Sequence, residues 1–183
     1  MADFFDRLQD DHIAFIHRQP MFFVATAAAD GRINLSPKGR DTFRVIDPAI
    51  GGYLDLTGSG NETAAHLKRD GRITFMFNSF DKKPLILRLY GRGRVAAKGS
   101  AEFEAHADKF PETPGARQII LIDIQSVQTS CGFAVPEMQL VSERDILTKW
   151  SLAKGEEGLR DYWAERNAKS IDGFETGMAP EGQ

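Results

Sequence analysis

The chain has 183 residues, 42% of them hydrophobic, and its 23 Lys and Arg against 26 Asp and Glu give a formal net charge of −3. This size allows one hydrophobic core but not two, so we expect a single domain over residues 1–170 and a flexible tail over residues 171–183. The balanced charge gives no reason to expect a nucleic-acid partner, and no apolar run is long enough to cross a membrane. We therefore expect a cytoplasmic protein with neither kind of partner.

The first half of the chain predicts one helix followed by short strands. Residues of one helical face recur over about four turns before Pro20, namely Phe5, Leu8, His12, Phe15 and Ile16. The Asp30-Gly31 pair predicts a tight hairpin between a strand from Met21 and a returning strand. Further strands are expected at residues 42–46 and 53–57, with a break at Gly51-Gly52.

The second half predicts a helix from Asn61 to Asp70, then two strands, RITFMFNSF and PLILRLYGRGRVAAKG. A helix over residues 101–110 and a long strand, ARQIILIDIQSVQT, follow. Ser142 and Asp145 have capping-box spacing before a C-terminal helix whose core face would hold Ile146, Leu147 and Trp150. Hairpin order with one inserted helix and terminal helices favours a mainly β fold, a small antiparallel β-barrel with flanking helices.

The sequence GSGNET before the central helix is a candidate anion site. Asn61 is a favoured N-cap, and the free N–H groups of a first helical turn, with the helix dipole, attract a phosphate. Close backbone approach and hydroxyl donors would come from Gly58, Ser59, Gly60 and Thr63. Many such turns bind nothing, however, and the Glu62 carboxylate must point away from any ligand.

A second polar cluster lies in NLSPKGRDTFR, which contains Ser36, Lys38, Arg40 and Arg44. Pro37 indicates an edge strand or a bulge, and Lys38 suits a reduced flavin ring or a phosphate, although a solvated edge has the same composition. Arg88 alternates with two leucines, so it faces either the same pocket or solvent. The four histidines lack zinc-site spacing, and we expect no metal. Cys131 is the one cysteine, so an internal disulfide is excluded. We interpret it either as a small apolar residue near a turn or as part of a site.

Three segments together resemble the pyridoxamine 5'-phosphate oxidase-like, FMN-binding split-barrel family: VATAAADGRINLSPKG, YLDLTGSGNETAAHLKRDGRITFMF and LRLYGRGRV. The resemblance covers residues 22–95, and the C-terminal sequence resembles a bacterial subgroup of the same family. It implies an antiparallel split β-barrel that forms a homodimer, with two FMN molecules at the subunit interface.

Carried over by position, the resemblance places a set of residues around the cofactor. Ser36, Pro37 and Lys38 would lie nearest the flavin ring, Leu56 and Thr57 would cover its next edge, and Asn61, Glu62 and Thr63 would meet the phosphate, with Arg88 as a further cation. True pyridoxamine phosphate oxidases differ here. They have a serine-arginine-lysine cluster in place of Asn61-Glu62-Thr63, an arginine in place of Ile33 and a glutamine near Ile86, so vitamin B6 oxidation is not implied.

The resulting hypothesis is an FMN-dependent oxidoreductase that acts on a small molecule, with no catalytic residue identified. Two alternatives remain open at this point. One is a non-catalytic split barrel that binds a flavin, a deazaflavin or haem. The other is a cofactor-free dimeric barrel used only for interaction.

Overall fold

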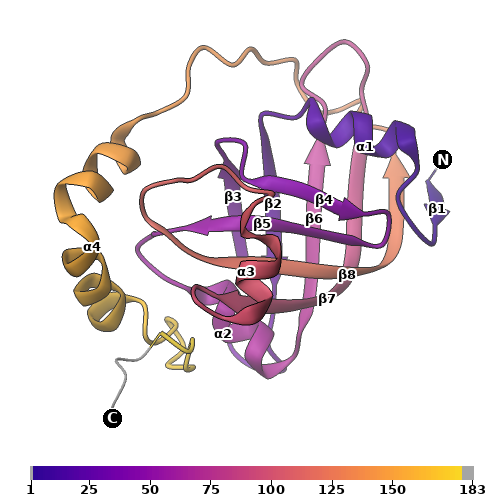
Figure 1. Cartoon of the computed structure of the whole chain (residues 1–183). Coiled ribbons are helices and arrows are strands. Elements are labelled where there is room, and N and C mark those ends of the chain that lie inside the picture. Colours follow the sequence, from indigo (N-terminus) through magenta and orange to yellow (C-terminus); the bar gives the residue numbers. More distant parts are fainter. Residues whose placement is uncertain (1, 179–183) are drawn as a thin grey trace.

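Eight antiparallel strands form one curled sheet in residues 2–178, the part of the chain that the computed structural model describes (Figure 1). The order across the sheet is β3-β2-β6-β7-β8-β5-β4, with β1 paired to β8, so β3 and β4 are edge strands. The strands are β1 (Asp3–Phe5), β2 (Met21–Thr26), β3 (Asn34–Gly39), β4 (Phe43–Asp47), β5 (Ile50–Leu56), β6 (Arg72–Asn78), β7 (Ile86–Ala97) and β8 (Ala116–Ser130). This confirms the mainly β, antiparallel split β-barrel with flanking helices.

Within residues 2–178, four helices lie around this sheet: α1 (Asp10–His17), α2 (Glu62–Arg69), α3 (Ala101–Ala107) and α4 (Ile146–Arg166) (Figure 1). Phe15 and Ile16 of α1 and Leu67 of α2 join the core inside the barrel. Ser100 begins α3, where its hydroxyl accepts a hydrogen bond from the Phe103 N–H. In the described part of the chain, no helix combines the length and the apolar character that crossing a membrane requires.

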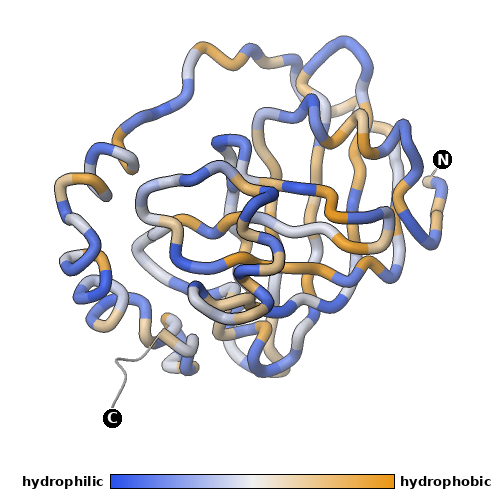
Figure 2. The backbone as a smooth tube through the Cα atoms, viewed as in Figure 1, coloured by the Kyte–Doolittle hydropathy of each residue, from blue (hydrophilic) through white to orange (hydrophobic). Residues whose placement is uncertain are grey.

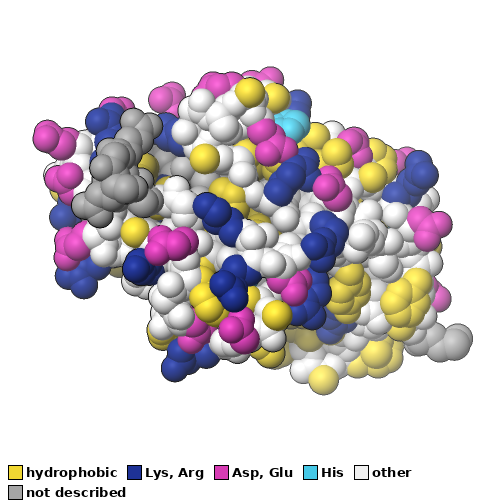
Figure 3. Space-filling model, turned by 90° about the horizontal axis from the view of Figure 1, so that it is seen from below, with side chains coloured by type: hydrophobic (Ala, Val, Ile, Leu, Met, Phe, Trp, Pro, Cys, Tyr) yellow, Lys and Arg dark blue, Asp and Glu magenta, His cyan; other side chains and the backbone are white. Residues whose placement is uncertain are grey.

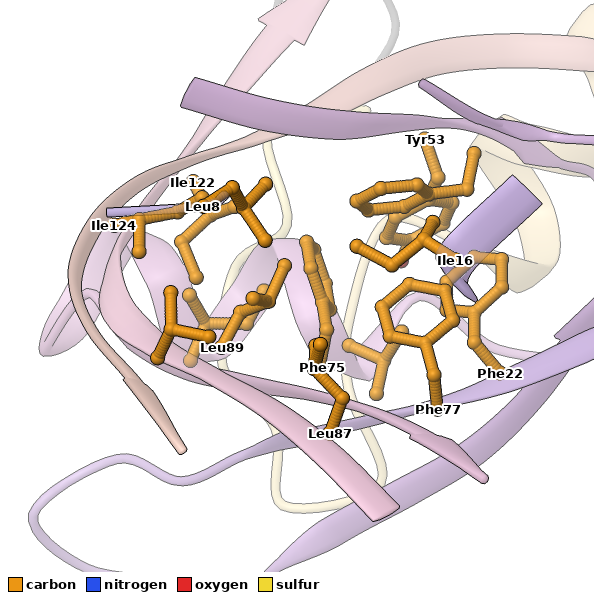
Figure 4. Packing of buried hydrophobic residues seen from close by; sticks show 14 of the residues in the cluster. Leu8, Ile16, Phe22, Tyr53, Phe75, Phe77, Leu87, Leu89, Ile122 and Ile124 are labelled. Atoms are coloured by element: carbon orange, nitrogen blue, oxygen red, sulfur yellow. The ribbon is translucent and has the colours of Figure 1, made fainter. Parts of the chain in front are cut away.

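The barrel core is built on packed aromatic rings (Figure 4). Phe22 packs edge-to-face against Phe43 and Tyr53, and stacks on Phe77 with ring centroids 5.4 Å apart. A second apolar cluster lies on the other face of β8, where Ile119 and Leu121 pack with residues of α3. Because both faces of β8 are buried, its sequence reads as a continuous apolar run, visible as orange tube (Figure 2).

Three predictions for the N-terminal half were wrong in detail. Asp30 and Gly31 do not form a tight hairpin but lie in a longer loop, residues 27–33, between β2 and β3. The first helix has 8 residues rather than about four turns, because residues 3–5 instead form β1 and pair with residues 127–129 of β8. Gly51 and Gly52 do not break a strand but lie inside β5. A Cβ at either position would come within 3 Å of the Phe43 ring or the Leu121 side chain, so these glycines permit close packing.

The predicted start and core face of the C-terminal helix were also wrong. Asp145 is the N-cap, and no side chain caps α4, so Ser142 forms no capping box. Ile146 is 71% exposed, while Leu159 and Ser151 are buried. Trp150 packs on Tyr162 of the same helix across a kink at Gly155, where φ is 66°.

The chain after α4 folds back along α2. Asp172 forms an ion pair with Arg32, and the Phe174 ring lies 4.1 Å from the Arg69 guanidinium carbon. Thr176 is buried. The first part of the predicted tail, residues 171–178, therefore has defined contacts, and residues 179–183 lie outside the described residues. Seen from below, the molecule carries basic and acidic side chains interspersed (Figure 3).

Candidate functional site

The edge strand β3 has polar side chains on its inner side. Asn34, Ser36 and Lys38 are half-buried, whereas Leu35 and Pro37 between them are exposed. The Ser36 hydroxyl donates to Asn34 Oδ1 over 2.9 Å, and Asn34 Nδ2 lies 3.2 Å from the Thr63 hydroxyl oxygen of α2. The structure thus connects two predicted site residues, Ser36 and Thr63, through Asn34, which the sequence analysis did not select.

The other side of the same strands forms a mixed surface that we call the outer face. Strand pairing aligns Pro37, Phe23, Met76 and Arg88 in one row across β3, β2, β6 and β7. Leu35 and Tyr90 lie at the ends of the next row, and both are exposed. Pro37 and Arg88 therefore face away from Ser36 and Lys38. The Arg88 guanidinium donates to the Ser130 hydroxyl over 3.2 Å.

Asn61 is the N-cap residue of α2, as predicted, but its side chain does not cap the helix. Its Oδ1 instead accepts a hydrogen bond of 2.8 Å from Gln118 Nε2 of β8. Asn61 is only 2% exposed, and within residues 2–178 its Nδ2 has no hydrogen-bond partner. The first-turn N–H groups of α2 thus lack a side-chain acceptor and lie beside an unpaired buried donor, an arrangement suited to an anion.

A buried charged cluster adjoins this helix start. Asp55 of β5 is 1% exposed and accepts hydrogen bonds from Arg117 Nε at 2.8 Å and Gln118 Nε2 at 2.8 Å. Lys38 Nζ lies 3.3 Å from the other Asp55 oxygen. The cluster consists of Lys38, Asp55 and Arg117. Its two cations and one carboxylate give it a net charge of +1. Its local field therefore favours a further negative charge nearby.

Opposing influences set the pKa of the Asp55 carboxyl. Burial raises it, but Arg117 and then Lys38 lower it, as do the hydrogen bonds from Arg117 and Gln118, and the net result is a pKa below the ordinary value. The carboxyl therefore remains ionised at neutral pH. Burial also raises the pKa of the neighbouring Tyr53 well above its usual value.

This lowered pKa predicts how stability changes in acid. A carboxyl whose pKa is depressed on folding stabilises the protein above its unfolded pKa, about 3.9 for aspartate, and the contribution disappears as the pH falls through the lower folded value. The difference in unfolding free energy between wild type and Asp55→Asn should therefore be constant above about pH 5 and narrow below about pH 4. Urea unfolding at several pH values measures it. A difference that widens on acidification would contradict the assignment.

The C-terminal segment covers the start of α2. Asn167 accepts from Arg117 Nη1 at 2.7 Å and donates to the Gly58 carbonyl at 3.1 Å. The Glu62 carboxylate accepts a hydrogen bond from the Ile171 N–H at 3.0 Å. Glu62 is thus held toward this segment, and the covering residues 167–171 must move before a ligand can reach the Asn61 amide from that side.

The remaining predicted residues lie near the site or outside it. Thr57 donates its hydroxyl to the Gly115 carbonyl at 2.7 Å and accepts from Trp163 Nε1 at 2.8 Å. Leu56 packs with the cluster beneath α3, on the opposite side of β5 from Asp55. Cys131 is exposed and free.

A groove of about 1,510 Å³ separates α4 from the barrel. Arg117, Gln118 and Trp163 line it, together with Leu159 and Lys68. The groove therefore borders Arg117 and Gln118 and the last turn of α2.

Besides Asn34, three residues of this site were missed from the sequence: Asp55, Arg117 and Gln118. A signal was present in each case. Asp55 is the one charged residue in the apolar strand YLDLT, and Arg117 and Gln118 begin the apolar run of β8. A charge within a strand whose neighbours are buried needs a partner, and pairing places Asp55 directly opposite Gln118.

Known proteins resemble this chain in both sequence and fold. Residues 8–131 match the sequence profile of the family described as pyridoxamine 5'-phosphate oxidase. The pyridoxamine 5'-phosphate oxidase family protein ustO of Aspergillus flavus is 36% identical over 194 residues, covering 95% of this chain and 77% of ustO.

Two solved structures share the fold. A Lactobacillus delbrueckii protein that carries the pyridoxamine 5'-phosphate oxidase name has a TM-score of 0.54 at 21% identity, covering 67% of this chain and 94% of that protein. HupZ of Group A Streptococcus has a TM-score of 0.51 at 20% identity, covering 66% and 91%. At these identities the two structures show only the shared split barrel. The sequence match over residues 8–131 and the similarity to ustO establish that the chain belongs to the pyridoxamine 5'-phosphate oxidase family.

Proposed function

We propose that this protein is a cytoplasmic FMN-binding oxidoreductase that acts on a small molecule, with the FMN phosphate at the start of α2. The observation that carries this proposal is the uncapped N-terminus of α2 beside Asn61 Nδ2, a buried donor with no partner in residues 2–178. A buried donor without an acceptor costs stability, so an acceptor supplied by a ligand is expected there. Family membership favours a flavin phosphate as that acceptor.

The inner row of β3 residues offers polar contacts for the rest of the cofactor. Asn34, Ser36 and Lys38 lead from the start of α2 along β3, as far as the ion pair between Lys38 and Asp55. Bound FMN would supply hydride-transfer chemistry, and the protein would orient the ring and stabilise its charge. True pyridoxamine phosphate oxidases have cationic side chains within the segment that is Asn61-Glu62-Thr63 in this chain. Here, the net positive charge of the Lys38, Asp55 and Arg117 cluster takes their place.

The covering C-terminal segment gives this proposal a conformational requirement. Residues 167–171 are held by hydrogen bonds to Gly58 and Glu62 at the edge of the helix start. Local opening of a terminal segment costs less than global unfolding, so binding can proceed through an open form. FMN that enters this way should also release the Ile171 amide from Glu62.

A homodimer that associates through the outer face is part of this proposal. Leu35 is 66% exposed on an edge strand, and Pro37 beside it is exposed as well. An exposed apolar ridge on a sheet edge favours association unless another surface covers it. A second copy of this chain would cover the ridge and remove its apolar side chains from water.

Leu35→Glu should therefore shift the protein from dimer to monomer, because two carboxylates would be placed in a desolvated interface. Sedimentation velocity measures the change. Val141→Glu is the matched control, since Val141 is 93% exposed and lies outside the outer face. Monomeric wild-type protein, or an equal effect of the two substitutions, would contradict the proposed interface.

Purified protein tests the cofactor directly. We expect a flavin absorption spectrum, or its appearance when FMN is added, and a released ligand with the mass of FMN. Colourless protein whose fluorescence and melting temperature are unchanged by FMN would overturn the proposal. If the protein binds flavin but turns over no electron donor, the proposed binding site is supported and the proposed oxidoreductase activity is refuted.

A further inference from the structure

The Gln118 side chain of β8 bridges two other side chains, Asp55 and Asn61. It is 2% exposed, and its Nε2 lies 2.8 Å from Asp55 Oδ2 and 2.8 Å from Asn61 Oδ1. An amide nitrogen has two hydrogens, so both are used by these two acceptors. This geometry couples the charged cluster to the start of α2.

The direction of each hydrogen bond follows from the chemistry of Asp55. An ionised carboxylate can only accept, and Asp55 is flanked by Arg117 at 2.8 Å and Lys38 at 3.3 Å, which keep it charged. Gln118 must therefore turn its nitrogen, not its oxygen, toward Asp55. The second hydrogen of the same nitrogen then requires an acceptor, and the atom that Asn61 presents to it must be Oδ1.

The consequence is that Asn61 has only a donor left. Its Nδ2 is buried and has no partner in residues 2–178, and it belongs to the N-cap residue, beside the free N–H groups of the first turn. A freely rotating asparagine amide could equally present an oxygen, which would repel an anion. Fixing the amide removes that alternative before any ligand arrives.

We propose that Gln118 is a positioning residue that holds the Asn61 amide with Nδ2 as a donor to a phosphate group at the start of α2. This inference rests on the proposed function, because the phosphate is that of FMN. Gln118 itself need not touch the ligand. Its role is to transmit the orientation set by Asp55, Arg117 and Lys38 to Asn61.

Comparison of FMN with riboflavin isolates the phosphate contribution, since riboflavin has the same ring without the phosphate. Gln118→Met keeps the length of the side chain and removes its hydrogen bonds, so Asn61 is no longer fixed. We expect FMN affinity to fall about 5- to 20-fold while riboflavin affinity stays within about twofold. Fluorescence titration gives both values, and their ratio cancels any general loss of structure.

A double-mutant cycle distinguishes positioning from a merely structural effect. Asn61→Ala removes the donor, so Gln118→Met in that background should not weaken FMN binding further. Additive losses, or an unchanged FMN-to-riboflavin ratio in Gln118→Met alone, would overturn the positioning role. Wild-type protein that binds neither flavin would instead overturn the proposed function.

A measurement on wild-type protein applies even where Gln118→Met does not fold. In ¹⁵N-labelled protein, FMN should shift the side-chain amide signals of Asn61, identified by their loss in Asn61→Asp, and riboflavin should not. The Gln118 amide signals should remain in place with either flavin. A phosphate-dependent shift of Gln118 in place of Asn61 would contradict the assignment.

Discussion

Asp55→Asn should lower the free energy of unfolding by about 3–5 kcal/mol, because it leaves a buried guanidinium without its carboxylate. The Arg117 side chain is 4% exposed and donates hydrogen bonds to Asp55 and Asn167. After the substitution, Asn167 would be the one of these two acceptors that is unchanged. The asparagine has nearly the same volume as aspartate, so the loss reflects charge and not packing. Urea unfolding monitored by circular dichroism measures it.

Asp123→Asn on β8 is the matched control. Asp123 pairs with Arg94 at 2.7 Å, but its side chain is 56% exposed, so its loss should cost less than about 1 kcal/mol. Equal effects of the two substitutions would show that the Asp55 cluster contributes no more than a surface ion pair. In that case its role in orienting the site would also be unsupported.

Asn61→Asp should weaken FMN binding by at least about 100-fold, because it replaces a donor to the phosphate with a negatively charged oxygen. Asp has nearly the same volume as Asn, and its oxygen can still accept the hydrogen bond from Gln118. Folding should therefore be preserved. FMN titration followed by quenching of flavin fluorescence measures the affinity.

Riboflavin provides the internal control for this substitution. Its affinity for Asn61→Asp should match that for wild type within about threefold, since no phosphate faces the new carboxylate. A parallel loss of riboflavin binding would indicate damage to the ring site. Unchanged FMN affinity would place the phosphate elsewhere.

Local patterns predicted most of the barrel. The strand from Met21, the apolar run of β8 and the helix that starts at residue 101 are each set by neighbouring residues, and these elements lie where the sequence indicates. Residues 3–5 were misassigned because a helix-like spacing of apolar residues competes with pairing to a strand more than 120 residues away. Such long-range pairing has no local signal.

The candidate site was predicted unevenly for the same reason. Asn61 and Lys38 were found from turn and charge patterns, but their partners Asp55, Gln118 and Arg117 come from two other strands. The contact between Ile171 and Glu62 joins residues 109 positions apart and could not be read from either segment. Side-chain orientation at Asn61 depends on those partners, so only the structure reveals a free Nδ2.

A crystal structure of this protein with FMN would test the central claim most directly. We expect phosphate oxygens within hydrogen-bond distance of Asn61 Nδ2 and of the N–H groups at residues 62 and 63, with the ring against Ser36 and Lys38. The Asn167 contact to Gly58 should be broken or rearranged. FMN bound with its phosphate away from α2, while Asn61 Nδ2 stays unpaired, would contradict the account.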